Sequence, residues 1–497
     1  MKKNYLKLCA IQEKIYNLNH AKSILNWDQA TIMSVHGNHA RSQSIAEISG
    51  LIHQLISKKN IKKLILASQV EDLNELERAN LREIKNEWLL TYNLPKKLIT
   101  ANHLSKLKCE FEWRKQREQN DWKGFLINFR KVVNHTREEA KILSNTLNIS
   151  PYDALIQRYD QGLKSNEIDK LFLQLKKWLP KLTSQICKKQ KKNKPVQIKK
   201  NLDIKKQKKL CLEIIKLLGF NLNRGRLDES IHPFCGGVKE DVRITTRFHK
   251  STFLHSLYAS IHETGHARYE QNLPSAMYNQ PVSRARSMSI HESQSLFFEK
   301  QIGCNPNFIK RISPIIKRYF DFDPGLDLDQ VDFFSLINTV QPSYIRVDAD
   351  EVTYPIHIIV RYEIEKNLIN GDIEPEDMPS LWNEKMIKYL GINTNRNYKD
   401  GILQDIHWPG GQFGYFPCYT VGAIYAAQWF HFASKDIDNI DQIIFSGNLE
   451  IIFEWLNKNI WSNGSKFETP ELTKKACKGE TLNVKYFKKH LENRYLI

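Results

Sequence analysis

Residues 256–273 read SLYASIHETGHARYEQNL, and they contain the pattern His-Glu-x-x-His at His262, Glu263 and His266. We predict that this stretch is a helix that begins at Ser256 and ends before the next proline. Because residues four apart lie on one face of a helix, the two imidazoles can bind one zinc ion. Glu263 would then lie beside the metal-bound water as its base. The alternative is a pair of surface histidines with a solvated glutamate.

The residues around this pattern favour the metal site over that alternative. A chain with 16 histidines and 55 acidic residues is expected to contain roughly 0.06 such patterns by chance. Ile261, Ala267 and Tyr269 add apolar side chains, which indicates a buried helix face whose ionisable groups need a partner. A catalytic zinc site also needs a third protein ligand. The segment HESQS, on the next predicted helix, offers His291 and Glu292 for that role.

Most of the chain is predicted to be helical. In residues 46–69 and 73–93 apolar side chains recur near i, i+3, i+4 and i+7, and Asp72 is the expected N-cap of the second stretch. The low content of breakers, 21 glycines and 17 prolines, agrees with a helical fold. Further helices are predicted over residues 97–119, 122–147, 165–189, 289–302, 352–368 and 420–432. Just before the metal-site helix, the β-branched run 242–246 predicts a short strand.

The charge of the chain excludes little. The net charge is +19, and the densest basic run is KKQKKNKPVQIKKNLDIKKQKK, residues 188–209. This run has no interleaved aromatic residues and no nucleic-acid-binding motif beside it, so we interpret it as solvated surface and expect no nucleic-acid partner. No run of about 18 apolar residues is present, so no membrane association is expected either.

The eight cysteines are scattered along the chain and form no CxxC pair. The sequence therefore predicts neither a cysteine zinc site nor a disulfide framework. The first residues contain no apolar core of a secretory signal. A reduced, cytoplasmic protein is the simplest interpretation.

Several separated motifs resemble those of one enzyme family, the thermostable Taq-type metallocarboxypeptidases. The resemblance extends over essentially the full length of the chain. It is carried by WDQAT (27–31), YDALIQRYDQG (152–162), DVRIT (241–245), HETGHARYEQ (262–271), HESQ (291–294), IRVDAD (345–350) and GILQDIHW (401–408).

The resemblance implies a large, all-helical, zincin-like fold with a deep substrate groove, the zinc at its floor and a small β element beside the metal-site helix. Residues 1–497 would form a single catalytic domain, in which the helical half 1–225 is one wall of the groove and the half 226–497 carries the zinc site. The family relationship also implies a homodimer that uses zinc, with cobalt as a working substitute.

The resemblance further implies roles for individual residues. His262, His266 and Glu292 would be the metal ligands, and Glu263 would be the catalytic carboxylate that takes a proton from water and returns it to the leaving amine. His291 would lie beside a ligand or face the substrate. The developing oxyanion needs further donors, and His407 and Tyr419 are the candidates. For Tyr419 the alternative is a hydrogen-bonded core tyrosine.

An enzyme that removes C-terminal residues must bind a free carboxylate, and the planar fork of arginine suits that task. Arg243 in DVRIT and Arg346 in IRVDAD are the candidates, although each has an acid nearby and the alternative is a structural ion pair. The resemblance favours substrate binding for both. Asp350 and Asp405 could instead orient the zinc-binding histidines.

We therefore predict a zinc-dependent carboxypeptidase that releases single C-terminal residues from peptides with broad specificity. The main alternative is a zinc-dependent oligo-endopeptidase that shares the His-Glu-x-x-His helix. Arginines that bind a free carboxylate are the feature that separates the two. A basic binding protein without catalytic activity is a third possibility, which the intact set of ligands and base disfavours.

Overall fold

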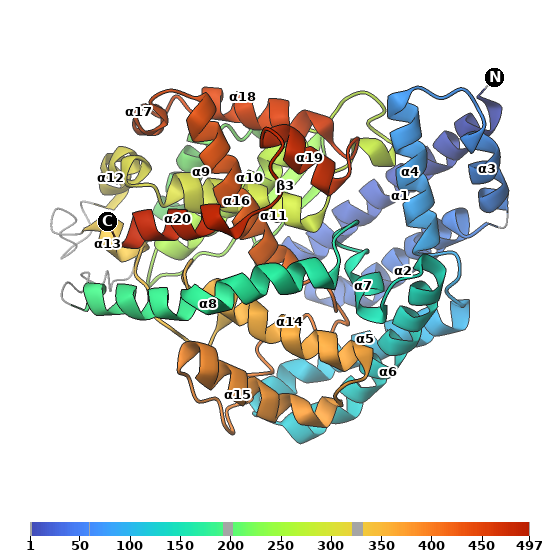
Figure 1. The fold of residues 1–497 in the computed structure, drawn as a ribbon, viewed down its shortest axis with the longest axis horizontal. Helices are drawn as coiled ribbons and strands as arrows, with labels where there is room; N and C mark the ends of the chain where they lie inside the picture. Colours follow the sequence, from blue (N-terminus) through green and yellow to red (C-terminus); the bar gives the residue numbers. More distant parts are fainter. Residues whose placement is uncertain (1, 59, 192–201, 321–331, 497) are drawn as a thin grey trace.

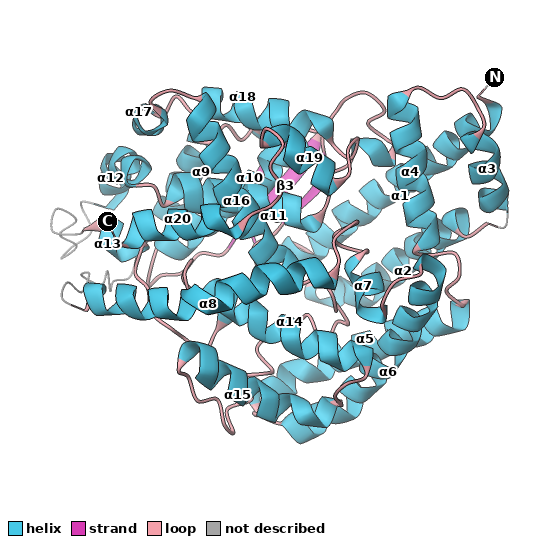
Figure 2. Cartoon of the chain, in the orientation of Figure 1, coloured by secondary structure: helices cyan, strands magenta, loops and turns pink. Residues whose placement is uncertain are grey.

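The computed structural model describes residues 2–58, 60–191, 202–320 and 332–496. Helices make up most of these residues, and the described chain contains a single small sheet (Figure 2). The mainly α fold with a small β element is therefore confirmed. The middle of the lysine-rich run, residues 192–201, lies outside the described residues.

The N-terminal half is a series of helices, coloured blue to green in Figure 1. Helix α4 begins one residue after Asn74, whose side chain accepts a hydrogen bond from the backbone N–H of Glu77, while the Glu77 carboxylate accepts one from the backbone N–H of Asn74. This reciprocal pair makes Asn74 the N-cap, so the predicted cap at Asp72 is wrong. The helices are α1 (Lys3–Thr31), α2 (Asn38–Ile56), α3 (Asn60–Gln69), α4 (Glu75–Leu89), α5 (Lys96–Glu118), α6 (Trp122–Leu147), α7 (Pro151–Ile156) and α8 (Ser165–Gln190).

The second half contains the predicted metal-site helix and the helices that pack around it. Those predicted over 256–273, 289–302, 352–368 and 420–432 are all present, with ends shifted by a few residues. The helices are α9 (Ile204–Leu217), α10 (Leu254–Gln271), α11 (Met288–Leu296), α12 (Pro306–Phe320), α13 (Phe333–Ile337), α14 (Tyr354–Asn370), α15 (Met378–Leu390), α16 (Pro417–Asp436), α17 (Ile440–Ser446), α18 (Glu450–Asn459), α19 (Thr469–Ala476) and α20 (Val484–Tyr495). Helix α11 continues into a π-helix, Phe297–Gly303.

The small sheet lies against the metal-site helix α10. It comprises β1 (Gly225–Glu229), β2 (Cys235–Val238) and β3 (Asp241–Thr246) in the order β1-β3-β2, with β1 parallel and β2 antiparallel to β3. The predicted strand over 242–246 is thus confirmed as the central strand. Because side chains alternate along a strand, Val242 and Ile244 are buried in the apolar cluster that contains Ala267 of α10, while Arg243 points to the other face.

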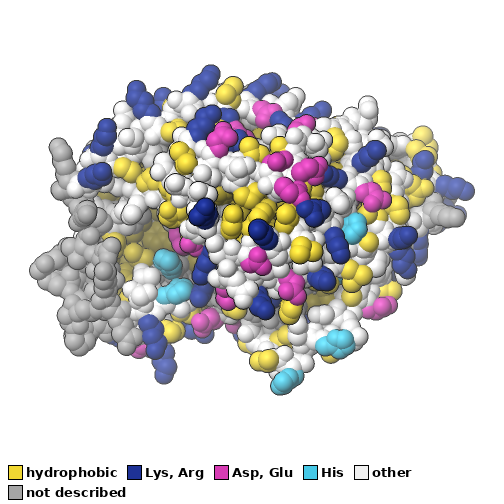
Figure 3. Space-filling model, turned by 90° about the horizontal axis from the view of Figure 1, so that it is seen from below, with side chains coloured by type: hydrophobic (Ala, Val, Ile, Leu, Met, Phe, Trp, Pro, Cys, Tyr) yellow, Lys and Arg dark blue, Asp and Glu magenta, His cyan; other side chains and the backbone are white. Residues whose placement is uncertain are grey.

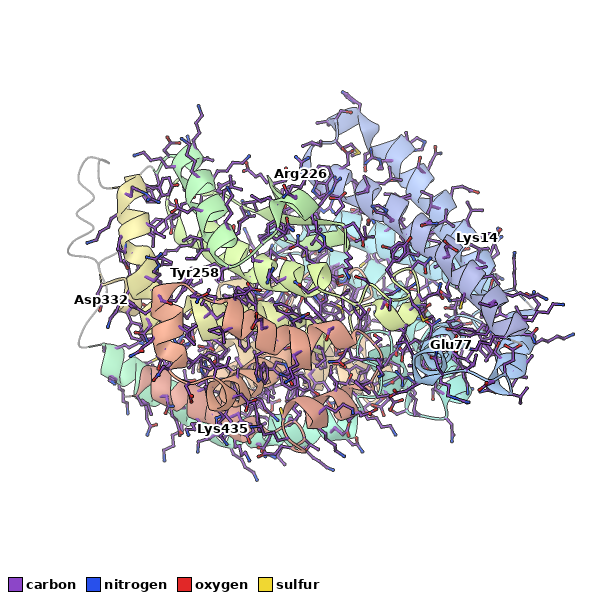
Figure 4. All side chains as sticks on the ribbon, turned by 90° about the horizontal axis from the view of Figure 1, so that it is seen from above. Lys14, Glu77, Arg226, Tyr258, Asp332 and Lys435 are labelled. Carbon is purple, nitrogen blue, oxygen red and sulfur yellow. The ribbon has the colours of Figure 1, made fainter. Side chains whose placement is uncertain are left out.

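Helix α16 connects the two large apolar cores. Ile424 and Ala427 belong to the core that also contains α6, α8, α14 and α15, whereas Val421 and Trp429 belong to the core around α10, α11 and α18. Helix α10 is also joined to the π-helix, because the hydroxyl of Tyr258 (Figure 4) donates to the backbone carbonyl of Gly303 at 2.9 Å. The metal-site helices therefore lie in the densely packed interior of the molecule.

The surface of the molecule is basic without one dominant patch on the face shown in Figure 3. There the Lys and Arg side chains are spread among acidic and apolar ones. Among the described helices, none combines the length and the apolar composition that crossing a bilayer requires.

Candidate active site

Helices α10 and α11 bring three potential metal ligands together. The Oε2 atom of Glu292 lies 3.4 Å from Nε2 of His266 and 3.8 Å from Nε2 of His262. Ligand atoms about 2.0–2.2 Å from a tetrahedral ion are separated by about 3.3–3.6 Å, so these three atoms need to move little to enclose one ion. Within the described part of the chain, this is the one cluster of His, Cys, Asp or Glu with such geometry. The residues present therefore fit a divalent metal.

Two glycines allow the helices to approach closely enough to form the cluster. A Cβ atom on Gly265 of α10 would lie 2.4 Å from the carbonyl oxygen of Gln294, on α11. A Cβ atom on Gly422 of α16 would lie 2.9 Å from the side chain of Glu292. Such distances are far below van der Waals contact, so these positions require glycine. The sequence HETGH thus supplies both the ligands and the close approach that brings in Glu292.

The ring of His262 is oriented by a carboxylate that the sequence analysis missed. Nδ1 of His262 lies 2.7 Å from Oε2 of Glu299, in the π-helix after α11. Because a carboxylate only accepts, Nδ1 must carry the proton, and Nε2 keeps its lone pair for the metal. Glu299 follows Glu292 by seven residues, close to two helical turns, and that spacing is the signal from which it could have been found.

The ring of His266 is oriented by a chain of two residues. Its Nδ1 atom lies 2.6 Å from Nδ1 of His291, and Nε2 of His291 lies 2.8 Å from Oε1 of Glu270. If Nε2 of His266 binds the metal, its Nδ1–H donates to His291, whose Nε2–H donates to Glu270. His291 therefore lies beside a ligand. Glu270, one turn after His266 on the same helix, was missed by the sequence analysis.

Glu263 is buried beside the ligand cluster, next to His262 on α10. Burial raises the pKa of Glu263 to about 7, against the opposing effect of His262. A carboxyl group whose pKa lies near neutrality can both accept and return a proton. Burial lowers the pKa of His266 to about 4, so this imidazole is neutral at neutral pH.

His407 and Tyr419 form a second polar group beside the cluster. Nε2 of His407 lies 3.0 Å from the hydroxyl of Tyr419. Burial, with a contribution from the charge of Arg346, lowers the pKa of His407 to about 3. Burial raises the pKa of Tyr419 well above its usual value. Tyr419 lies on α16 three residues before Gly422, which contacts Glu292. Both groups are therefore neutral hydrogen-bonding partners.

Arg346 lies in a buried ion cluster next to this group. Its guanidinium binds Oδ1 of Asp405 through two nitrogens, at 2.9 and 2.8 Å, and donates to the hydroxyl of Tyr354 at 2.7 Å. Arg361 binds the other oxygen of the same carboxylate. The ion-pair alternative is thus realised, but two guanidinium groups share one carboxylate and leave one positive charge in excess. The guanidinium also lies 5.2 Å from the ring centre of Tyr419.

Asp350 and Asp405 do not contact the histidines of the ligand cluster in the way that the sequence suggested. Asp350 accepts from the backbone N–H groups of Gln341, Val352 and Thr353, and so stabilises the start of α14, while Asp405 binds the two arginines. The interpretation that they orient the zinc-binding histidines is therefore wrong, because Glu299 and His291 occupy those positions.

Arg243 is separate from the metal cluster in its contacts. It forms three hydrogen bonds to Asp241 at 2.7–3.1 Å, and its guanidinium lies 4.3 Å from the ring centre of Trp27 in α1. Its neighbour in β1, Arg226 (Figure 4), lies on the same ring at 4.9 Å. The described contacts of Arg243 include no residue of the ligand cluster.

Comparisons with known proteins agree with the motifs and the geometry. The family profile described as carboxypeptidase Taq (M32) metallopeptidase matches residues 7–495. Carboxypeptidase 1 of Bacillus subtilis is 35% identical, with 97% of this chain and 96% of that protein covered. Thermostable carboxypeptidase 1 of Thermus thermophilus is 33% identical, with 99% and 98% covered. The solved structure of Trypanosoma cruzi metallocarboxypeptidase 1 superposes with a TM-score of 0.96 at 39% identity, with 100% of both chains covered.

Proposed function

The chain belongs to the carboxypeptidase Taq (M32) family and is a metallocarboxypeptidase, and from this premise we propose that its metal is zinc, held by His262, His266 and Glu292. Two imidazole nitrogens and one carboxylate oxygen, with one position left open, are a ligand set that suits catalytic zinc. Cobalt is expected to substitute. When bound, such an ion lowers the pKa of a water molecule and polarises the scissile carbonyl.

Glu263 is the proposed general base of the reaction. It adjoins the ligand His262 in the chain, and its buried carboxylate accepts the proton of the attacking water. It then delivers that proton to the nitrogen of the leaving residue. The burial of Glu263 and its place next to His262 on α10 support this role.

Tyr419 is the proposed donor to the oxyanion that develops on the scissile carbonyl. The hydroxyl of Tyr419 stays protonated, and for its single O–H to reach the oxyanion, Nε2–H of His407 must donate to the phenol oxygen. Such donors act best in a site that already holds them in place, and the packing of Tyr419 against Arg346 provides that.

Arg346 is the residue proposed to bind the terminal carboxylate of the substrate. Two observations support this role. Arg346 and Arg361 carry one more positive charge than Asp405 neutralises. The neighbouring phenols of Tyr354 and Tyr419 have pKa values to which the charge of Glu292 contributes. Arg243 stays a second candidate from the resemblance, and its contacts with Asp241 and Trp27 favour a structural role. The substrates are accordingly peptides with a free C-terminus. The carboxypeptidase relatives support this activity over an oligo-endopeptidase.

The deciding experiment compares a peptide with a free C-terminus and its C-terminally amidated form. The protein is expected to release the last residue from the free form and to act poorly on the amide. Arg346→Gln should lower the rate of release from the free form, and so reduce the difference in rate between the two peptides. Equal cleavage of both peptides by the unaltered protein would contradict carboxylate recognition, and zinc analysis of the same preparation tests the metal.

We further propose a domain organisation, a cellular compartment and an oligomeric state. Residues 1–497 would form one catalytic domain, in which 1–225 is one wall of a groove and 226–497 carries the zinc site. The contact of Trp27 with Arg243 joins the two halves and supports a single domain. All eight cysteines are unpaired, which suits a reduced cytoplasmic environment. A homodimer follows from the family resemblance and can be tested by sedimentation.

A further inference from the structure

We propose that Lys300 is a positioning residue of the metal centre, which holds Glu299 in place so that Glu299 can fix the ring of His262. The inference rests on the proposed ligation of zinc by His262, and it adds a cation that lies outside the ligand set. It concerns metal affinity and ligand orientation, and both can be measured without an activity assay.

The geometry forms a chain of three side chains that ends at the metal ligand. One carboxylate oxygen of Glu299, Oε2, lies 2.7 Å from Nδ1 of His262. The other oxygen, Oε1, lies 2.6 Å from the ammonium group of Lys300. All three side chains are at least three-quarters buried, with exposed fractions of 22%, 16% and 23%. Because each oxygen has its own partner, the orientation of the carboxylate is fixed at both ends.

A further carboxylate, that of Glu351, adds negative charge to the surroundings of Lys300. Burial disfavours the charged amine, yet the carboxylates of Glu299 and Glu351, among other groups, hold the pKa of Lys300 above its usual value. Glu351 in turn binds three side chains of α20, which are His490, Arg494 and Tyr495. Gln301, the residue after Lys300, also contacts His490, at 3.3 Å. The segment that carries Glu299 and Lys300 is therefore tied to the C-terminal helix through Gln301 and His490.

Removal of Lys300 would leave Glu299 as a buried carboxylate with one polar partner. A buried charge that loses its counter-ion is strongly destabilised, and the side chain is expected to turn toward solvent or to become protonated. In either case the hydrogen bond that orients His262 is weakened. Losses of such outer contacts typically reduce metal affinity by about tenfold to a hundredfold.

The second imidazole ligand provides an internal comparison. His266 is oriented by His291 and Glu270, and none of the described contacts of these two residues involves Lys300. A change at Lys300 should therefore disturb one ligand and leave the other in place. The expected result is a weakened and distorted site that still binds metal, in contrast to the loss of the site on removal of a ligand.

The experiment titrates zinc into the metal-free full-length protein in competition with a chromophoric chelator. Lys300→Met is expected to raise the zinc dissociation constant by about tenfold or more, and Lys300→Arg, which keeps the charge, to restore most of the affinity. Lys385→Met is the matched control, since Lys385 is similarly buried and binds Glu363 at 2.7 Å within α14 and α15. It should bind zinc like the unaltered protein. The visible spectrum of the cobalt-loaded protein should change in Lys300→Met and not in Lys385→Met.

His262→Ala separates a failure of this inference from a failure of the proposed metal site. If His262→Ala loses zinc and Lys300→Met binds it as tightly as the unaltered protein, the inference about Lys300 is wrong and the site stands. If His262→Ala also binds zinc normally, the proposed site itself is wrong. The unfolding midpoint of each metal-free variant checks its fold. If Lys300→Met does not fold, Lys300→Gln is measured in its place. An unchanged zinc affinity of Lys300→Gln would show that the site does not need a cation at this position.

Discussion

Gly422 of α16 lies against Glu292 of α11 so closely that a Cβ atom on the glycine would be 2.9 Å from the Cβ atom of the glutamate. The packing of two helices thus sets the position of Glu292, the proposed third metal ligand. We expect Gly422→Ala to displace Glu292 and to reduce zinc affinity by about tenfold, the scale found when ligand orientation is disturbed. Zinc titration of the metal-free variant measures this.

Gly50→Ala is the control for this substitution. Gly50 lies within α2, and a Cβ atom there would meet no atom within 4 Å. Because alanine favours helix more than glycine does, this variant should keep zinc affinity and gain about 0.5–1 kcal/mol in stability. If Gly422→Ala also binds zinc normally, the close approach of α16 does not position the ligand.

Glu263 can be separated from the ligands by its effect on turnover. Glu263→Gln keeps the size of the side chain and removes its basicity, so zinc content should stay at one ion per chain while kcat falls by about 10²–10⁴-fold. Measurements of kcat and of bound zinc on the same preparation test this. Near-normal turnover of the zinc-loaded variant would remove Glu263 as the base.

The two histidines of the proposed metal site could be predicted from sequence because they follow local helix geometry, whereas the choice of Glu292 over His291 came from the family resemblance. His262 and His266 are four residues apart, and the apolar residues around them indicate a buried face. Strand alternation was also available: Val242 and Ile244 are apolar, so Arg243 had to point away from the face that packs on α10. With the apolar periodicity of the other helices, these patterns predict the helical fold, the central strand and the position of the metal-site helix.

The partners of the buried arginines and of Asp350 could not be predicted, because they depend on contacts between distant segments. Arg346, Arg361 and Asp405 come from three separate segments, and no spacing rule indicates that two arginines share one carboxylate. Asp350 has the residue type of a partner for a zinc-bound histidine, yet it stabilises the start of α14 through backbone N–H groups. Residue type predicts the chemistry that a side chain can perform, whereas tertiary packing selects its partner.

Tyr419 should contribute to the transition state more than to substrate binding. Tyr419→Phe removes the donor and keeps the ring that packs beside Arg346, so kcat should fall by about tenfold to a thousandfold with a small change in KM. Tyr425→Phe on the same helix is the control, since its hydroxyl lies near Thr473 in the apolar core. Similar losses in both variants would indicate a packing defect of α16.

Glu365 should make the stability of the protein depend on pH. It is fully buried on α14, where its carboxylate accepts hydrogen bonds from Tyr152, Trp408 and the backbone of Gly414. Burial outweighs these contacts and raises the pKa of Glu365 from 4.5 to about 7. The folded state therefore binds more protons than the unfolded state between these values. This contribution to the free energy of unfolding is fully present below about pH 4.5 and is lost as pH rises toward 7.

Glu365→Gln tests this contribution, because glutamine does not titrate. Denaturant unfolding of both proteins in the same buffers cancels the groups that they share. The free energy of unfolding of the unaltered protein, relative to that of the variant, should fall by up to about 1.4 kcal/mol per pH unit between pH 4.5 and 7. A relative stability that stays constant or rises over this range would contradict the raised pKa. It would imply that the three donated hydrogen bonds outweigh burial and keep Glu365 ionised in the folded core.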